Sequence, residues 1–133
     1  MIVVDSSALV AILEREADAA DYAARIAGTD QLIVSAVNVH ETGMVLRARH
    51  GEAAERRLWA FLAANEFEIA PFDEAQARAA LTAFARYGKG IHPRARLNLA
   101  GCAAYALAIS RDAPLLFKGN DFAATDVRRA AEP

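Results

Sequence analysis

The chain has 133 residues, of which 55% are hydrophobic and 24% are charged, and its formal net charge is −2. This composition predicts one globular domain over residues 1–133 and excludes general electrostatic attraction to nucleic acid, so any such binding must come from a local patch. The single cysteine, Cys102, excludes an internal disulfide and fits a reducing cytoplasm. We expect neither a secretory signal nor a membrane span, because the N-terminus turns acidic at Asp5 and the longest apolar run, 99–109, is too short.

Short apolar runs alternate with helical patterns along the chain. We predict, in chain order, a strand at 2–5, helices at 6–16 and 17–28, a strand at 31–36, helices at 37–51 and 52–65, a strand at 67–72, a helix at 73–88, a basic loop at 89–98, a buried helix at 99–110, a strand at 114–117 and a last weak strand within 125–133. This alternation favours an α/β fold with a central parallel sheet of four to five strands flanked by helices. Ligands of such sheets bind at the carboxyl ends of the strands.

Three of the acidic residues follow predicted strands. Asp5 ends the first strand, Asp121 follows the fourth in the turn "KGND", and Asp126 lies five residues further on. Each has a structural alternative, because Asp5, like Ser6 or Ser7, is a good helix cap and the other two suit turns.

Glu41 is a carboxylate within a predicted helix. It lies three or four residues from Val37, Met44 and Val45 and should share their apolar face. Burial of a carboxylate there is costly unless it is paired or binds a cation, whereas a position at the rim would let it reach solvent.

Asp5, Glu41 and Asp121 come from separate segments but map to one edge of the predicted sheet. Carboxylates a few Å apart repel one another, and a hard divalent cation such as Mg²⁺ removes that penalty. Such a metal activates water and stabilises a departing phosphate oxygen. The sequence therefore predicts a metal-dependent phosphoryl-transfer site.

Four segments resemble the PIN-domain ribonucleases, and more narrowly the VapC toxins of bacterial type II toxin–antitoxin pairs: "MIVVDSSALVAIL", "SAVNVHET", "HPRARLNLAGCAAYALA" and "PLLFKGNDFAATDV". The resemblance implies a PIN fold, Mg²⁺- or Mn²⁺-dependent cleavage of tRNA or ribosomal RNA, a homodimer, and a cognate antitoxin. It implies metal ligation by Asp5, Glu41 and Asp121, with Ser7 and Asp126 as accessory residues.

The chain departs from the resembled family at Gly101. The family usually reads "LNxGDCxAYALA", whereas this chain reads "LNLAGCAAYALA", which puts Gly101 where the family has a catalytic aspartate. Either the toxin is naturally weakened, or the residue is a substitution selected or introduced against toxicity, or another acid, most plausibly Asp126, compensates. We expect weak metal binding and poor RNA cleavage.

The basic loop offers contacts for RNA phosphates. Arg94, Arg96 and Lys118 are the principal candidates, beside Lys89 and His92; each taken alone is better explained as a solvated charge, whereas the cluster indicates a positioning surface. The helix pair over 37–65 carries Trp59, Phe61 and Leu62, which indicate either core packing or an antitoxin or dimer interface.

Two other functions compete with a nuclease. A catalytically inactive module that only binds its antitoxin is compatible with Gly101. A receiver-like phospho-acceptor domain shares the strand–helix alternation, but Asp5 is followed by two serines rather than an acid, and Asp73 and Lys118 match such a domain only loosely.

Overall fold

The sheet has four parallel strands in the order β3-β2-β1-β4. A computed structural model describes residues 1–130 and confirms the predicted α/β architecture. The strands are short and almost wholly buried except for β3: β1 (Ile2–Val4), β2 (Leu32–Ser35), β3 (Glu68–Ala70) and β4 (Leu115–Leu116). Parallel strands that are buried on both faces read as continuous apolar runs, which explains "IVV" and "LIV".

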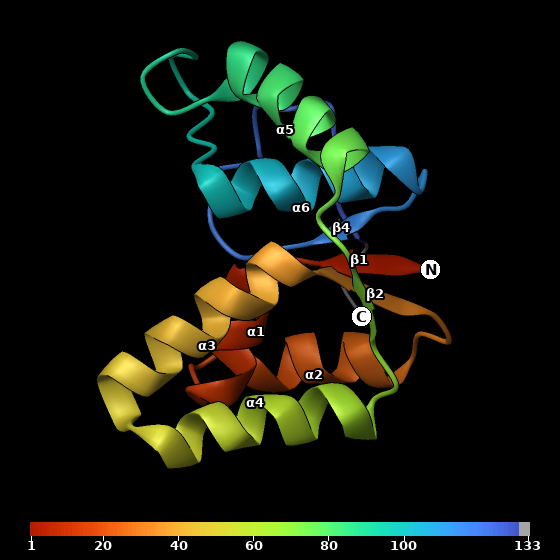
Figure 1. The fold of residues 1–133 in the computed structure, drawn as a ribbon. Helices are drawn as coiled ribbons and strands as arrows, with labels where there is room; N and C mark the ends of the chain where they lie inside the picture. Colours follow the sequence, from red (N-terminus) through yellow and green to blue (C-terminus); the bar gives the residue numbers. More distant parts are fainter. Residues whose placement is uncertain (131–133) are drawn as a thin grey trace.

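Helices cover both faces of the sheet (Figure 1). One face carries α5 and α6, and the other carries α1 to α4. Their bounds are α1 (Ser6–Leu13), α2 (Ala19–Ala27), α3 (Ala36–His50), α4 (Glu52–Ala64), α5 (Glu74–Tyr87) and α6 (Leu99–Ser110). None of the helices in residues 1–130 combines the length and the apolar character needed to cross a membrane.

Two hydrophobic cores lie on opposite faces of the sheet. Val3, Ile33 and Leu115 pack toward α5 and α6. Their strand neighbours Ile2, Val4, Leu32, Val34 and Leu116 belong to the core under α1 to α4. This division follows from the alternation of side chains along each strand.

The central position of β1 brings distant segments of the chain together. Val3 pairs with Leu115, and the Asp5 amide donates to the Leu116 carbonyl at 2.9 Å. The residues that follow β1, β2 and β4 therefore meet at one edge of the sheet, as the sequence predicts.

Two segments differ from the predicted elements. The first helix ends at Leu13 rather than at residue 16, because the chain turns at Arg15, whose φ is +56°. The tail contributes a bridge rather than a strand: Ala130 donates to the Leu115 carbonyl at 2.9 Å, and Leu115 donates to that of Arg128 at 2.8 Å. The remainder of the predicted last strand, 131–133, lies outside the described residues.

Candidate active site

A cleft of about 360 Å³ lies at the carboxyl edge of the sheet. The predicted acids Asp5, Glu41 and Asp121 all line it, together with Ser7, Gly101 and Lys118 and with Glu16 and Arg49, which sequence reasoning had not assigned to the site. The acids come from the end of β1, from α3 and from the loop after β4. The topology therefore assembles the carboxylates that the sequence predicts at this edge.

Asp5 is the buried acid of the cleft, with 6% of its surface exposed. Its Oδ2 accepts hydrogen bonds from the Ser7 amide at 2.9 Å and the Ser7 hydroxyl at 2.6 Å, so it caps α1 as well as lining the cleft. Burial raises the pKa of Asp5 to about 6, and the charge of Glu41 adds to this effect, while the bonds from Ser7 oppose it. Asp5 is thus both the cap of α1 and a residue of the site.

Asn38 lies in the core and donates a hydrogen bond to Asp5, a contact that the sequence did not predict. Its side chain is fully buried, and Nδ2 donates to Asp5 Oδ1 at 3.3 Å, to Ser6 Oγ at 2.8 Å and to the Ala100 carbonyl at 3.1 Å. One amide therefore joins α3, the start of α1 and the first turn of α6. Because α3 carries several other polar residues, hydrophobic periodicity does not identify Asn38 as a buried position.

Glu41 and Asp121 lie at the rim of the cleft. The buried face of α3 is formed by Asn38, Val39, Thr42 and Leu46, whereas Met44 is 58% exposed. The apolar stripe predicted around Glu41 is therefore not the buried one, and Glu41 is only partly buried, as the rim alternative predicts.

Gly101 lies in the first turn of α6 and lines the cleft. Its amide donates to Asn98 Oδ1 at 2.8 Å, which is the cap of the helix. An added Cβ would lie 3.2 Å from that oxygen and 3.5 Å from Leu97 Cδ2, and the backbone is not in the left-handed region. Neither backbone strain nor lack of space thus requires glycine here.

The residues present do not form a complete metal site. Carboxylate oxygens are the ligands that Mg²⁺ prefers, so the chemistry of the cleft is appropriate. However, residues 1–130 contain no group of three Asp, Glu, His or Cys side chains close enough to hold a metal ion. Gly101 supplies no carboxylate at the position where the resembled family has one.

Asp126 does not line the cleft. Its carboxylate accepts a hydrogen bond from the Tyr105 hydroxyl at 2.5 Å and lies 3.7 Å from the Arg86 guanidinium. The bond from Tyr105 lowers the pKa of Asp126. The structure therefore does not bring this predicted accessory acid to the other three.

The predicted RNA contacts lie on two adjoining loops. Arg94 and Arg96 are exposed, and the Arg96 amide donates to the Asp121 carbonyl at 3.3 Å, so the basic loop adjoins the acids. His92 has a structural role, since its Nδ1 accepts from the amides of Arg94 and Ala95 at 3.0 and 2.9 Å. Lys118 lines the cleft itself.

Comparison with known proteins agrees with this fold. The sequence matches the PIN domain family over residues 2–128. Ribonuclease VapC28 of Mycobacterium tuberculosis is 44% identical over 130 residues, which cover 98% of each protein. The chain therefore belongs to the PIN-domain family and, within it, to the VapC ribonucleases.

Two solved structures share the fold over the full length of both chains. VapC20 of Mycobacterium tuberculosis, described as a sarcin–ricin loop cleaving toxin, superposes with a TM-score of 0.83 at 17% identity. VapBC2 of Rickettsia felis, bound to a DNA fragment from its promoter, superposes with a TM-score of 0.74 at 16% identity. The receiver-like alternative is therefore wrong, and Asp73 serves as the cap of α5.

Proposed function

We propose that the chain is an endoribonuclease toxin of the VapC type, with its site in the cleft at the carboxyl edge of the sheet. The observation that carries this proposal is the meeting of Asp5, Glu41 and Asp121, which come from three separate segments, in one cleft. The identity with Ribonuclease VapC28 over nearly the whole chain supports it.

The activity of this chain is impaired by the glycine at position 101. The resemblance assigns Asp5, Glu41 and Asp121 as ligands of the divalent ion, Mg²⁺ or Mn²⁺, but these three side chains do not form a complete site, and a fourth carboxylate is missing at the first turn of α6. The absence of a compact group of metal-binding side chains within residues 1–130 supports weak metal binding. Asp126 does not compensate, because Tyr105 and Arg86 hold it outside the cleft.

The substrate is tRNA or a structured site in ribosomal RNA. Arg94, Arg96 and Lys118 contact its phosphates, which positions the chain without reading bases. The description of VapC20 as a sarcin–ricin loop cleaving toxin gives one precedent of this class within the fold.

The partners are a cognate antitoxin and a second copy of the chain. A toxin–antitoxin complex from Klebsiella pneumoniae contains a chain of the same fold, with a TM-score of 0.69 at 19% identity. On the helix pair α3–α4, Leu62 is buried in the core, whereas Trp59 is 50% exposed and is available to a partner.

A cytoplasmic location follows from an RNA substrate and agrees with the buried free thiol of Cys102.

The decisive experiment compares RNA cleavage by the chain and by its Gly101→Asp variant, with Mn²⁺ and with EDTA. We expect the variant to cut total tRNA or ribosomal RNA at least about a hundredfold faster, because a single ligand or charge-stabilising group typically contributes that much. A double variant that also carries Asp5→Asn should be inactive and serves as the control for contaminating nuclease. Equal cleavage by the chain and by Gly101→Asp would contradict the impairment.

A second function, an inactive module that only binds its antitoxin, is favoured by Gly101 alone. It predicts stoichiometric antitoxin binding by the chain without turnover, and no gain of cleavage in Gly101→Asp. The same pair of proteins therefore decides between the two functions.

A further inference from the structure

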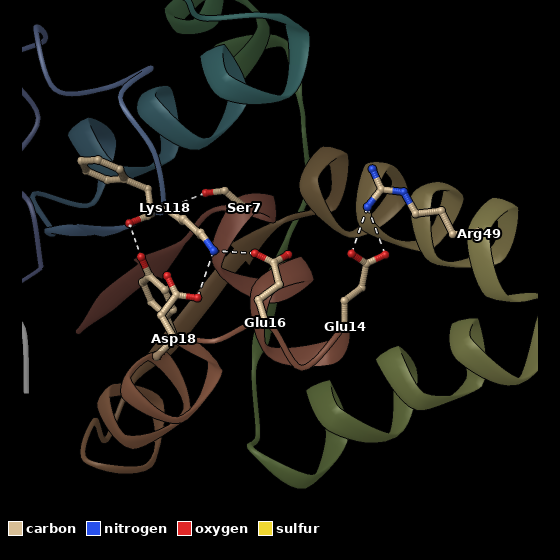
Figure 2. A network of polar contacts seen from close by, with 8 residues as sticks. Ser7, Glu14, Glu16, Asp18, Arg49 and Lys118 are labelled. Carbon is tan, nitrogen blue, oxygen red and sulfur yellow. Dashed lines mark hydrogen bonds and ion pairs between the residues drawn. The ribbon is translucent and has the colours of Figure 1, made fainter.

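Two cations flank the acidic cleft, and one short connection between helices binds both of them. Arg49 comes from α3 and Lys118 from the loop after β4, and both line the cleft. The connection from α1 to α2, residues 14–18, supplies the carboxylates that bind them. In Figure 2, Glu16 and Asp18 face Lys118, while Glu14 faces Arg49.

The two side chains of the Arg49–Glu14 ion pair differ strongly in their exposure to solvent. Arg49 Nη1 donates to both carboxylate oxygens of Glu14, at 2.9 and 3.1 Å, and His50 Nε2 lies 3.2 Å from the same carboxylate. The Glu14 side chain is only 14% exposed, whereas that of Arg49 is 57% exposed. Glu14 therefore holds Arg49 through the terminal Nη1, while more than half of the Arg49 side chain remains exposed beside the cleft.

Lys118 is tied to the buried acid of the site as well as to the connection. Its ammonium contacts Glu16 at 2.5 Å and Asp18 at 3.0 Å. Its amide donates at 2.9 Å to the hydroxyl of Ser7, which in turn donates to Asp5. The position of this cation is thus fixed relative to the carboxylate at the floor of the cleft.

We propose that Arg49 and Lys118 bind RNA phosphates on the two sides of the acidic cleft, and that Glu14, Glu16 and Asp18 occupy these cations until RNA displaces them. The inference rests on the proposed ribonuclease function. It adds Arg49 to the RNA contacts and identifies the carboxylates that compete with RNA for Arg49 and Lys118. It concerns binding alone.

The exchange is chemically plausible because phosphate and carboxylate present the same acceptor geometry to a cation. A guanidinium binds either one through paired N–H groups, whereas an ammonium binds either one as a point charge. Ion pairs that solvent reaches contribute little free energy, and the cation of each pair here is more than one third exposed, so a polyanion that also releases counterions can replace the carboxylates. The net charge of −2 makes such fixed cations more important, because the chain has no general attraction for RNA.

The test measures the affinity for a fluorescein-labelled RNA hairpin whose 2′-hydroxyls are methylated to prevent cleavage, by anisotropy at several salt concentrations. Arg49→Gln and Lys118→Gln should each lower the affinity about three- to tenfold at 0.1 M salt, and each should reduce the salt slope by about 0.7 to 0.9. Glu14→Gln should raise the affinity about two- to fivefold, because it removes the competitor for Arg49.

A matched ion pair between α3 and α4 provides the controls. Arg47 contacts Glu55 at 3.1 Å, and neither residue lines the cleft. Arg47→Gln and Glu55→Gln change the net charge as the test variants do, and they should change the affinity less than about twofold. A rise in Glu55→Gln equal to that in Glu14→Gln would overturn the inference by showing an effect of net charge alone.

Unchanged RNA affinity in Arg49→Gln and Lys118→Gln would also overturn it, and a loss of antitoxin binding in these variants would then assign the two cations to the protein partner. Whether Gly101→Asp cuts RNA distinguishes a failure of this inference from a failure of the proposed function. If Gly101→Asp cuts RNA while the affinities stay unchanged, only the inference fails; if the hairpin does not bind and Gly101→Asp does not cut, both fail.

Discussion

At position 101, the requirements of the fold can be separated from those of the proposed chemistry. Gly101 occupies an ordinary helical position whose amide is capped by Asn98, and the neighbouring Cys102 is buried in the core. Glycine costs a helix about 1 kcal/mol relative to alanine, so the fold does not benefit from it. Nothing in the structure explains the glycine, which leaves this part of the cleft without a side chain.

Gly101→Ala should therefore raise the free energy of unfolding by about 0.5 kcal/mol, which is less than the full propensity gain because the new Cβ would lie close to the Asn98 oxygen. Urea unfolding of both proteins measures the difference. Gly43→Ala is the control, because Gly43 is also helical and its Cβ would meet Leu58 Cδ2 at an ordinary 3.6 Å. A loss of stability in Gly101→Ala alone would show that the cap requires glycine.

The bond between Tyr105 and Asp126 predicts a dependence of stability on pH. Because the pKa of Asp126 is lowered in the folded chain, its contribution is present above the ordinary carboxyl value, about 4, and is lost as the pH falls through the folded value. Tyr105→Phe should cost about 1 kcal/mol at pH 7, a value discounted for the exposure of the carboxylate, and less at pH 3.

Urea unfolding from pH 7 to pH 3 measures this change. Tyr22→Phe provides the comparison, since the Tyr22 hydroxyl only reaches the Phe117 carbonyl at 3.5 Å and its loss should not depend on pH in this range. A Tyr105→Phe effect that stays constant from pH 7 to pH 3 would contradict the assigned charge on Asp126.

The arrangement of helices and strands was largely predictable, whereas the tertiary polar contacts were not. Continuous apolar runs and glycine or cap signals predicted all four strands and six helices, because they depend on local patterns. The early end of α1 at Leu13 was missed, since "ERE" continues a helical pattern. Arg49 and Asn38 were missed for another reason: their partners are distant in sequence, and polar residues within a helix look like solvated ones.

The hydrogen bonds of Asn38 connect α3 with α1 and α6, and stability measurements can detect this connection. Asn38→Ala should lower the free energy of unfolding by about 3 kcal/mol, because it removes the buried amide that donates to Asp5, Ser6 and Ala100 and creates a small cavity. Thr42→Val, which removes only the 2.7 Å bond to the Asn38 carbonyl within α3, should cost about 1 kcal/mol. Equal costs would show that the amide does not connect the three helices.

At the scale of the whole molecule, the last described residues close the free edge of β4. Ala130 donates to Leu115 and is buried in the core under α1 to α4, and Arg129 stacks its guanidinium 4.4 Å from the centre of the Phe117 ring. The tail thus belongs to the same packed unit as the first residues of the chain.

Ala130→Asp should lower the free energy of unfolding by about 2 to 4 kcal/mol, because it places a carboxylate in an apolar core. Ala123→Asp, at an exposed position of the preceding loop, should change it by less than about 0.5 kcal/mol. Thermal and urea unfolding measure both variants, and a neutral Ala130→Asp would mean that the tail leaves the sheet in solution.

The pairing of the first strand with the last has a consequence for the order of events during protein synthesis. β1 is synthesised long before one of its two neighbours, β4, and before the carboxylate of Asp121. Until then β1 keeps an unpaired edge and the cleft lacks one wall. The cleft can therefore form only after β4 and the loop that carries Asp121 have been made, however early the other residues of the site are in place.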